Sequence, residues 1–215
     1  MNVEGIRQQF KEKWFDREFI EGRGGRTIEI IGASFLTDEV AIFGELNEGY
    51  VTKELQWYSS RSLNLNTFPG GAPNVWNLCS DPLGNINSNY GWCLDSEANG
   101  SQRQNVIEEL RRNRNSRRAI AIYTRPSMHR DAIEGGKEDF ICTNAVEYFI
   151  RNDRLHCVVQ MRSSDAVLGY RNDRAWHAKV LAEIASVLEV VIGYIYWQVG
   201  SLHIYDRHFF YLERV

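Results

Sequence analysis

The residues of this chain that could do chemistry begin with a cysteine, Cys142, in the segment Phe140-Ile141-Cys142-Thr143-Asn144. A thiolate here, just before a predicted strand, could add to an electrophilic carbon as a covalent catalyst. A cysteine without such a role is more often a small buried hydrophobic residue, and spacing alone leaves both interpretations open. Cys157 lies in the middle of an alternating strand, and we expect it in the core.

A run of arginines is the strongest charge feature of an otherwise acidic chain: Arg111, Arg112, Arg114, Arg117 and Arg118. Cations are favoured near the C-terminus of a helix, so the run could be a solvated helix end. It could also be a phosphate site, because arginine binds phosphate through two parallel hydrogen bonds. An RNA-binding patch is a third interpretation, although no aromatic residues are interleaved with these arginines.

Two further predicted strand ends carry polar residues. Arg162-Ser163 would suit a phosphate group. His203 and Tyr205 are two residues apart in a strand, so both side chains lie on one face, for binding or for packing. Judged alone, the carboxylates Glu54 and Asp165 are typical of a protein surface.

These residues must be positioned by a mixed set of elements. Apolar residues at helical spacing predict helices over 3–19, 52–60 (with Thr52 as its cap), 102–112 and 174–189. Alternating patterns predict strands over 27–31, 119–123, 145–150, 155–161, 192–197 and 202–205, the third and fourth forming a hairpin. Residues 61–90 are predicted to form a long loop, and Trp76 within it favours a functional one. The balance is an α+β fold in a single domain over residues 1–215.

Composition excludes several classes of protein. The 215 residues are 43% hydrophobic and 25% charged, which rules out disordered and collagen-like chains. A net charge of −3 argues against wholesale binding of nucleic acid or acidic membranes. The four cysteines are too few and too widely spaced for a disulfide scaffold or a zinc site. The charged N-terminus and the short apolar run at 190–197 predict a cytoplasmic protein with neither secretory signal nor membrane span.

Taken together, the motifs resemble the thymidylate synthase family over nearly the whole chain. They are Glu54-Leu55-x-Trp57, Trp76, Asn89-Tyr90-Gly91, Ser116-Arg117-Arg118, Cys142, Arg162-Ser163-Ser164-Asp165, Leu168-Gly169, Asp173 and His203-x-Tyr205. Segments 27–35, 86–92 and 123–128 look still more like one branch, the deoxycytidylate hydroxymethylases of T-even-like phages. The resemblance implies a large mixed sheet flanked by helices, a homodimer formed through a sheet face, and no metal.

The resemblance also implies a reaction and a role for each motif. The family joins a pyrimidine nucleotide to 5,10-methylenetetrahydrofolate: Cys142 would add to C6, and C5 would then attack the folate methylene. Glu54 and Tyr90 would serve the proton transfers. The residues implied for substrate binding are Arg162 and Ser163, Arg117 and Arg118 from across the dimer, and Arg23 (chosen over Arg26) for the phosphate, with His203 and Tyr205 for the sugar. Those implied for folate are Trp76, Asp165, Leu168 and Gly169.

Two positions depart from the synthases. Asp173 stands where they carry Asn, and a carboxylate suits the cytosine 4-amino group and a protonated N3 better than it suits uracil. Alternatively, Asp173 caps a helix that begins at Arg174. Thr143 stands where synthases carry His. Both departures fit the branch in which water attacks the exocyclic methylene, giving 5-hydroxymethyl-dCMP and tetrahydrofolate.

The alternatives left are a thymidylate synthase, a dUMP or CMP hydroxymethylase, and a nucleic-acid-binding module that uses Arg111 to Arg118. The resemblance also concerns the segment that closes over the folate. The sequence ends twelve residues after His203, where family members generally continue into a tail over the folate, so we expect a shorter closure or another segment in that role.

Overall fold

The computed structural model describes residues 1–22 and 24–213, in which the chain forms two compact units. The first unit combines residues 1–46 with residues from 150 onward, and the second comprises residues 47–149. Both units contain helices and strands, so the predicted α+β class is confirmed. Among the described residues, no helix is both long enough and apolar enough to cross a membrane.

The sheet of the first unit is mixed. Its strands are β1 (Ile20–Gly22), β2 (Gly25–Leu36), β6 (Val191–Tyr205) and β5 (Arg154–Asp165), in that order. β6 pairs antiparallel with β2 and parallel with β5. A further strand, β4 (Thr143–Arg151), begins in the second unit and ends in the first, where Asn152 and Asp153 reverse the chain. Both turn residues have positive φ, 50° and 57°, as a two-residue hairpin turn requires, and this confirms the predicted reversal.

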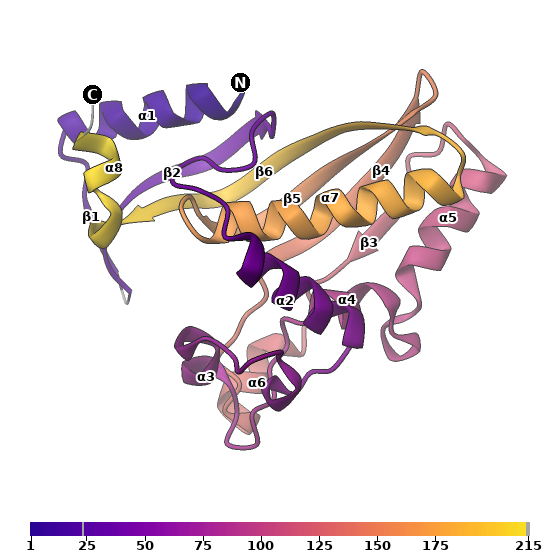
Figure 1. Cartoon of the computed structure of the whole chain (residues 1–215), viewed down its shortest axis with the longest axis horizontal. Coiled ribbons are helices and arrows are strands. Elements are labelled where there is room, and N and C mark those ends of the chain that lie inside the picture. Colours follow the sequence, from indigo (N-terminus) through magenta and orange to yellow (C-terminus); the bar gives the residue numbers. More distant parts are fainter. Residues whose placement is uncertain (23, 214–215) are drawn as a thin grey trace. The chain divides into compact units, whose positions relative to one another are not determined.

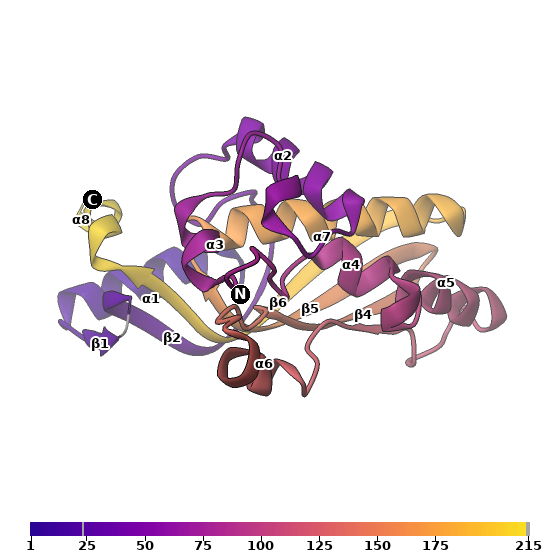
Figure 2. The same ribbon diagram turned by 90° about the horizontal axis from the view of Figure 1, so that it is seen from below.

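Helices cover this sheet. The first unit contains α1 (Val3–Phe15), α7 (Gly169–Val187), the turn η3 (Asp206–His208) and α8 (Phe210–Glu213). α7 runs along β5 and β6, and α1 lies beside β2 (Figures 1 and 2). Trp197 of β6 anchors the contact with α7, because its ring centroid lies 5.5 Å from that of Tyr170 and 5.6 Å from that of His177.

The alternation of buried residues changes phase at one level in three adjacent strands. In β2 the buried positions are Ile28 and Ile30, then Ala33 and Phe35. β5 and β6 change phase at their neighbouring positions 162 and 200. Gly32 there has a φ of 68°, and a Cβ at Gly200 would lie 2.7 Å from the Arg162 carbonyl oxygen, so both positions need glycine. The partly exposed side chains that follow position 162 in β5 and position 200 in β6, and those that precede Gly32 in β2, are mostly polar.

The second unit is mainly helical. It contains α2 (Glu48–Ser60), η1 (Leu65–Thr67), α3 (Asn74–Cys79), α4 (Tyr90–Asp95), η2 (Glu97–Asn99), α5 (Gln102–Arg112), β3 (Ile120–Ile122) and α6 (Met128–Gly135). β3 pairs antiparallel with β4. An aromatic row forms its centre: Tyr58 stacks on Tyr90 at 5.1 Å, and Tyr90 meets Tyr123 edge-on at 5.5 Å.

Most predicted elements are confirmed, α5 with its predicted bounds. The predicted cap Thr52 is wrong, because Asn47 caps α2 and accepts a hydrogen bond from the backbone of Tyr50. The predicted loop over 61–90 is wrong in part, because it contains η1 and α3. The two C-terminal strands are one continuous strand, β6.

Candidate active site

The predicted nucleophile occupies a well-anchored segment of the second unit. Cys142 is half-buried and directly precedes β4, between the fully buried Ile141 and Thr143. Thr124 Oγ1 donates to the carbonyl of Thr143 at 3.3 Å and contacts Asn144 Oδ1 at 3.0 Å. The backbone on the strand side of the thiol is therefore fixed.

The segment before the thiol is fixed by a buried carboxylate. Asp139 Oδ2 accepts hydrogen bonds from the backbone nitrogens of Asn87, at 2.6 Å, and Ser88, at 2.8 Å. Burial raises the pKa of Asp139 to about 6 in spite of these bonds. The bonds join the nucleophile's segment to the chain that leads into the Asn89-Tyr90-Gly91 motif, a connection that sequence reasoning missed.

Each end of that motif has a packing role. Asn89 is buried, caps α4 by accepting from Trp92 N, and donates to the carbonyls of Trp57 and Ser62. Gly91 lies directly against α2, since a Cβ there would be 1.8 Å from the Tyr58 carbonyl oxygen. The two residues hold Tyr90 against Tyr58.

We expect Gly91→Ala to destabilise the fold strongly, because a backbone carbonyl cannot move aside for the new methyl group. The expected loss is about 3 kcal/mol or more, a fall in Tm of roughly 10 °C. Thermal unfolding measures it, with Gly135→Ala as the matched control, because a Cβ at Gly135 meets nothing within 4 Å. Equal Tm values for the two variants would contradict this close approach of α4 to α2.

The sequence-based interpretation of Glu54 as a surface carboxylate is wrong. Glu54 lies in α2 and is 5% exposed, and Tyr50 Oη donates to its Oε1 at 2.8 Å. Trp76 Nε1 in turn donates to Tyr50 Oη at 3.4 Å, and Trp76 meets Trp57 edge-on at 5.6 Å. Burial raises the pKa of Glu54 to about 7, so the group can both take and give a proton near neutral pH.

This pKa makes stability depend on pH in a defined direction. The folded protein holds the Glu54 proton more tightly than the unfolded chain, so stability falls as pH rises from 4.5 through about 7. In the wild type this loss of unfolding free energy has contributions from Glu54 and Asp139. We expect Glu54→Gln to make the loss smaller by about 3 kcal/mol, so that the contribution of Asp139 is left. Urea unfolding over this pH range measures both proteins. Parallel curves would refute the buried, protonated Glu54.

The arginine run begins in the last turn of α5, continues into the loop that follows and is exposed, as either of its first two interpretations requires. Its loop is tied to Glu109 of α5, whose carboxylate accepts from Ser116 Oγ at 2.5 Å and pairs with Arg112 and Arg118. The Ser116 hydrogen bond and the two guanidinium groups lower the pKa of Glu109. Sequence reasoning missed Glu109, because α5 ends at Arg112 and no helical spacing links Glu109 to Ser116 in the loop.

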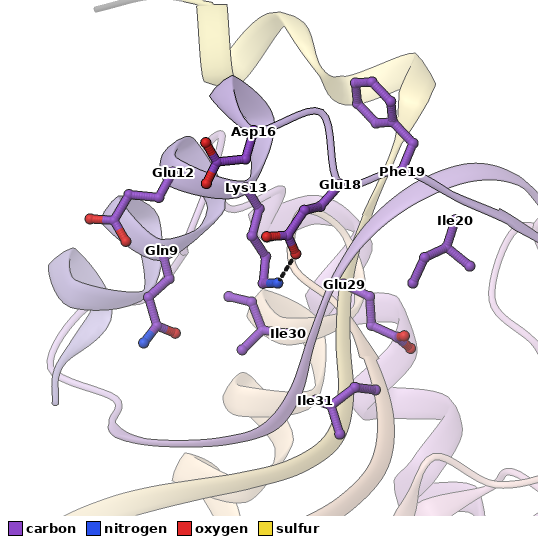
Figure 3. A pocket seen from close by; sticks show the side chains of 10 residues that line it. All are labelled: Gln9, Glu12, Lys13, Asp16, Glu18, Phe19, Ile20, Glu29, Ile30 and Ile31. Carbon is purple, nitrogen blue, oxygen red and sulfur yellow. Dashed lines mark hydrogen bonds and ion pairs between the residues drawn. The ribbon is translucent and has the colours of Figure 1, made fainter.

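In the first unit, several predicted residues share one face of the sheet. Asp165 lies opposite His203, which lies opposite Glu29 on its other side. Ser163 and Tyr205 are two residues away along their strands, so they share this face. Figure 3 includes Glu29, whose carboxylate also accepts from Ser201.

The electrostatics of this face favour a neutral imidazole. Burial lowers the pKa of His203, opposed by the carboxylates of Asp165 and Glu29. A neutral imidazole has one donor and one acceptor nitrogen, which is what a sugar hydroxyl needs. The ring meets Tyr205 edge-on at 5.0 Å, and Arg162 is exposed one residue before Ser163.

The turn before α7 brings together the remaining predicted residues. Asp165 Oδ1 accepts from the backbone nitrogens of Val167, at 2.7 Å, and Leu168, at 3.2 Å, so it is not a freely solvated carboxylate. The alternative of Asp173 as a helix cap is wrong, because α7 begins at Gly169 and Asp173 lies in its second turn. A Cβ at Gly169 would lie 3.9 Å from Asp173 Oδ2, so that carboxylate points back toward this turn.

The N-terminal segment carries the two candidates for the phosphate cation. Arg23, the predicted residue, lies outside the described residues. Arg26 is stacked over Phe19, 4.7 Å from the ring centroid.

A cavity of about 640 Å³ lies between α1 and β2 (Figure 3). Its walls carry Glu12, Asp16, Glu18 and Glu29, and its Lys13 pairs with Glu18. None of the predicted site residues lines it, and its carboxylates would repel a phosphate. Among the described residues, no group of three or more His, Cys, Asp or Glu side chains is arranged to hold a metal ion.

Comparisons with known proteins place nearly the whole chain beside named relatives. Residues 45–214 match the family described as thymidylate synthase. The chain is 46% identical to the deoxycytidylate 5-hydroxymethyltransferase of Enterobacteria phage T4, over 99% of this chain and 90% of the phage protein. The same values hold for the protein of that name in phage T2. It is 27% identical to a thymidylate synthase of Francisella tularensis subsp. holarctica, over 74% of this chain and 61% of that protein.

Proposed function

The chain belongs to the thymidylate synthase family, and from this premise we propose that it is a deoxycytidylate 5-hydroxymethyltransferase. The observation that carries the proposal is the 46% identity, over 99% of this chain, to phage proteins of that name. Asp173, on α7, supports the same choice of base. The reaction consumes dCMP, 5,10-methylenetetrahydrofolate and water, and yields 5-hydroxymethyl-dCMP and tetrahydrofolate, in the cytoplasm of an infected host.

Cys142 begins and ends the reaction. Its thiolate bonds to C6 of cytosine, and C5 then bonds to the folate methylene. Loss of the C5 proton expels tetrahydrofolate and leaves an exocyclic methylene, to which water adds as the Cys142 sulfur leaves C6. Two protons are released, from C5 and from water, and the two folate nitrogens that held the methylene take up two.

Proton transfer falls to Glu54 and Tyr90 in the second unit. The pKa of Glu54, raised to about 7 by burial, lets this group exchange protons with the base and with water. The Tyr50 hydroxyl fixes the orientation of its carboxylate. Tyr90, buried on Tyr58, would present its hydroxyl to the C5 proton network.

The first unit would bind most of the nucleotide. Arg162, Ser163 and Arg23 would hold the phosphate, and the neutral His203 with Tyr205 would bind the sugar 3′-hydroxyl. Asp173 would accept hydrogen bonds from the 4-amino group and a protonated N3 of cytosine. Folate would lie against Trp76, Leu168 and Gly169, with Asp165 bonded to the pterin. These roles require the two units to act as one catalytic domain over residues 1–215.

We further propose a homodimer in which Arg117 and Arg118 reach the phosphate bound by the partner. Support comes from β6, where Ile192, Tyr194 and Tyr196 occupy alternate positions of one face and are 51%, 55% and 42% exposed. A contiguous apolar surface of this kind is typical of an interface. The exposed arginines, on a separate loop, suit a site on a neighbouring subunit.

Mixing two variants that are each inactive at a low concentration of dCMP tests the dimer. Cys142→Ser keeps the arginines and Arg117→Ala keeps the nucleophile, so a mixed dimer contains one complete site. After the subunits are exchanged in mild denaturant, we expect about a quarter of wild-type activity, because half of the dimers are mixed. Each variant exchanged with itself is the control. A mixture that contains dimers yet stays inactive would refute shared sites.

Release of tritium from 5-tritiated dCMP tests the activity itself. We expect release that depends on methylenetetrahydrofolate, without the absorbance change of dihydrofolate formation. Release from dUMP with dihydrofolate would instead make the protein a thymidylate synthase, and release from CMP a ribonucleotide hydroxymethylase. If tritium were released from none of the three nucleotides, the proposal would be refuted.

A further inference from the structure

We propose that Glu109 is a positioning residue that fixes the loop of Arg117 and Arg118 and thereby presents Arg117 to the nucleotide phosphate. The inference rests on the proposed function and assigns different roles to two adjacent arginines. Arg118 ties the loop to Glu109 as well as reaching the phosphate, whereas Arg117 makes the stronger phosphate contact.

Glu109 is a largely buried carboxylate that is bonded to Ser116. Glu109 has only 10% of its side chain exposed, and its Oε1 accepts from Ser116 Oγ at 2.5 Å. The same serine oxygen accepts from the backbone nitrogen of Arg118 at 3.1 Å. One carboxylate therefore fixes the backbone on both sides of Arg117.

The guanidinium groups of the run differ in their contacts with Glu109. Nε and Nη2 of Arg118 each lie 3.3 Å from Glu109 Oε1, and Arg112 pairs with Oε2. Arg117 is exposed and, within the part of the chain that the structure describes, forms no ion pair or side-chain hydrogen bond. It is the one residue of Ser116-Arg117-Arg118 that Glu109 does not hold.

The entropy of the loop affects the affinity for phosphate. An arginine on a loose loop must be ordered when it binds phosphate, and that entropy lowers affinity. A loop already fixed by Glu109 avoids most of this loss. Removing the carboxylate should therefore weaken phosphate binding, although the carboxylate itself repels phosphate. The two effects have opposite signs, so an experiment can separate them.

The test compares Kd for dCMP, and for inorganic phosphate as a competitor, by calorimetry. We expect Arg117→Ala to raise Kd for dCMP by about a hundredfold, Glu109→Gln by about tenfold, and Arg118→Ala by less than Arg117→Ala. Arg111→Ala removes the same charge from the same run and is the control. Affinity for methylenetetrahydrofolate should be unchanged in all four variants.

A double variant identifies positioning. If Glu109 acts through Arg117, then Glu109→Gln should add nothing to Arg117→Ala, whereas a general loss of structure would add its full effect. Ser116→Ala should repeat the effect of Glu109→Gln if the latter variant folds poorly. Additive effects, tighter phosphate binding by Glu109→Gln, or an Arg118→Ala effect as large as that of Arg117→Ala would overturn the inference. Binding is read without turnover, so a wild-type protein that binds dCMP but releases no tritium would refute only the proposed function. A wild type that binds no nucleotide would refute both.

Discussion

Cys142→Ser is expected to lower the rate of tritium release from 5-tritiated dCMP by about four orders of magnitude or more, while dCMP binding stays within a few-fold of wild type. A serine hydroxyl is a far weaker nucleophile than a thiolate at neutral pH, and without the bond to C6 the C5 carbon cannot attack the folate. Turnover assays and calorimetry measure the two quantities on the same preparation.

The other three cysteines provide the control for this prediction. Burial raises the pKa of the Cys79 and Cys93 thiols to about 11, and it raises the pKa of Cys157 as well. Cys79, half-buried like Cys142, offers the matched variant Cys79→Ser, which should keep wild-type turnover. Normal turnover by Cys142→Ser would refute the covalent mechanism.

The sequence indicated candidate site residues but not the contacts that hold them. The Asn89-Tyr90-Gly91 motif could be recognised, but its physical reasons lie in carbonyls of residues 57, 58 and 62, which no periodicity links to it. Glu54 was misjudged for a similar reason. The aromatic side chains around its network, Phe68 and Trp76, come from the segment 61–90, where no hydrophobic pattern exists.

The start of helix α7 could not be predicted from a capping residue. Its apolar spacing is regular from Trp176 onward, but its first turn has glycine at the start and no side-chain cap, since Leu168 precedes it. Propensity therefore placed the start of the helix too late and made Asp173 a possible cap. The Asp165 side chain, by bonding to the backbone of the turn, helps to hold the chain where the helix begins.

Asp173→Asn is expected to reverse the choice of base, and its effect depends on that early helix start. Asparagine offers both a donor and an acceptor, as uracil N3–H and O4 require, and it loses the charge that favours a protonated cytosine. Buried sites with mismatched hydrogen bonds discriminate by about 10⁴-fold. We therefore expect the ratio of dCMP to dUMP tritium release to fall by roughly 10³-fold or more.

Asp165→Asn is the matched control, because it makes the same chemical change at a carboxylate on the other side of Gly169. It should keep the preference for dCMP and raise KM for methylenetetrahydrofolate. Asp173 lies in the second turn of α7 and is not its cap, and Tm measured beside the kinetics separates a lost activity from lost folding. An unchanged base ratio in Asp173→Asn would mean that another group reads the base, and the assignment of cytosine would then rest on likeness to the phage proteins alone.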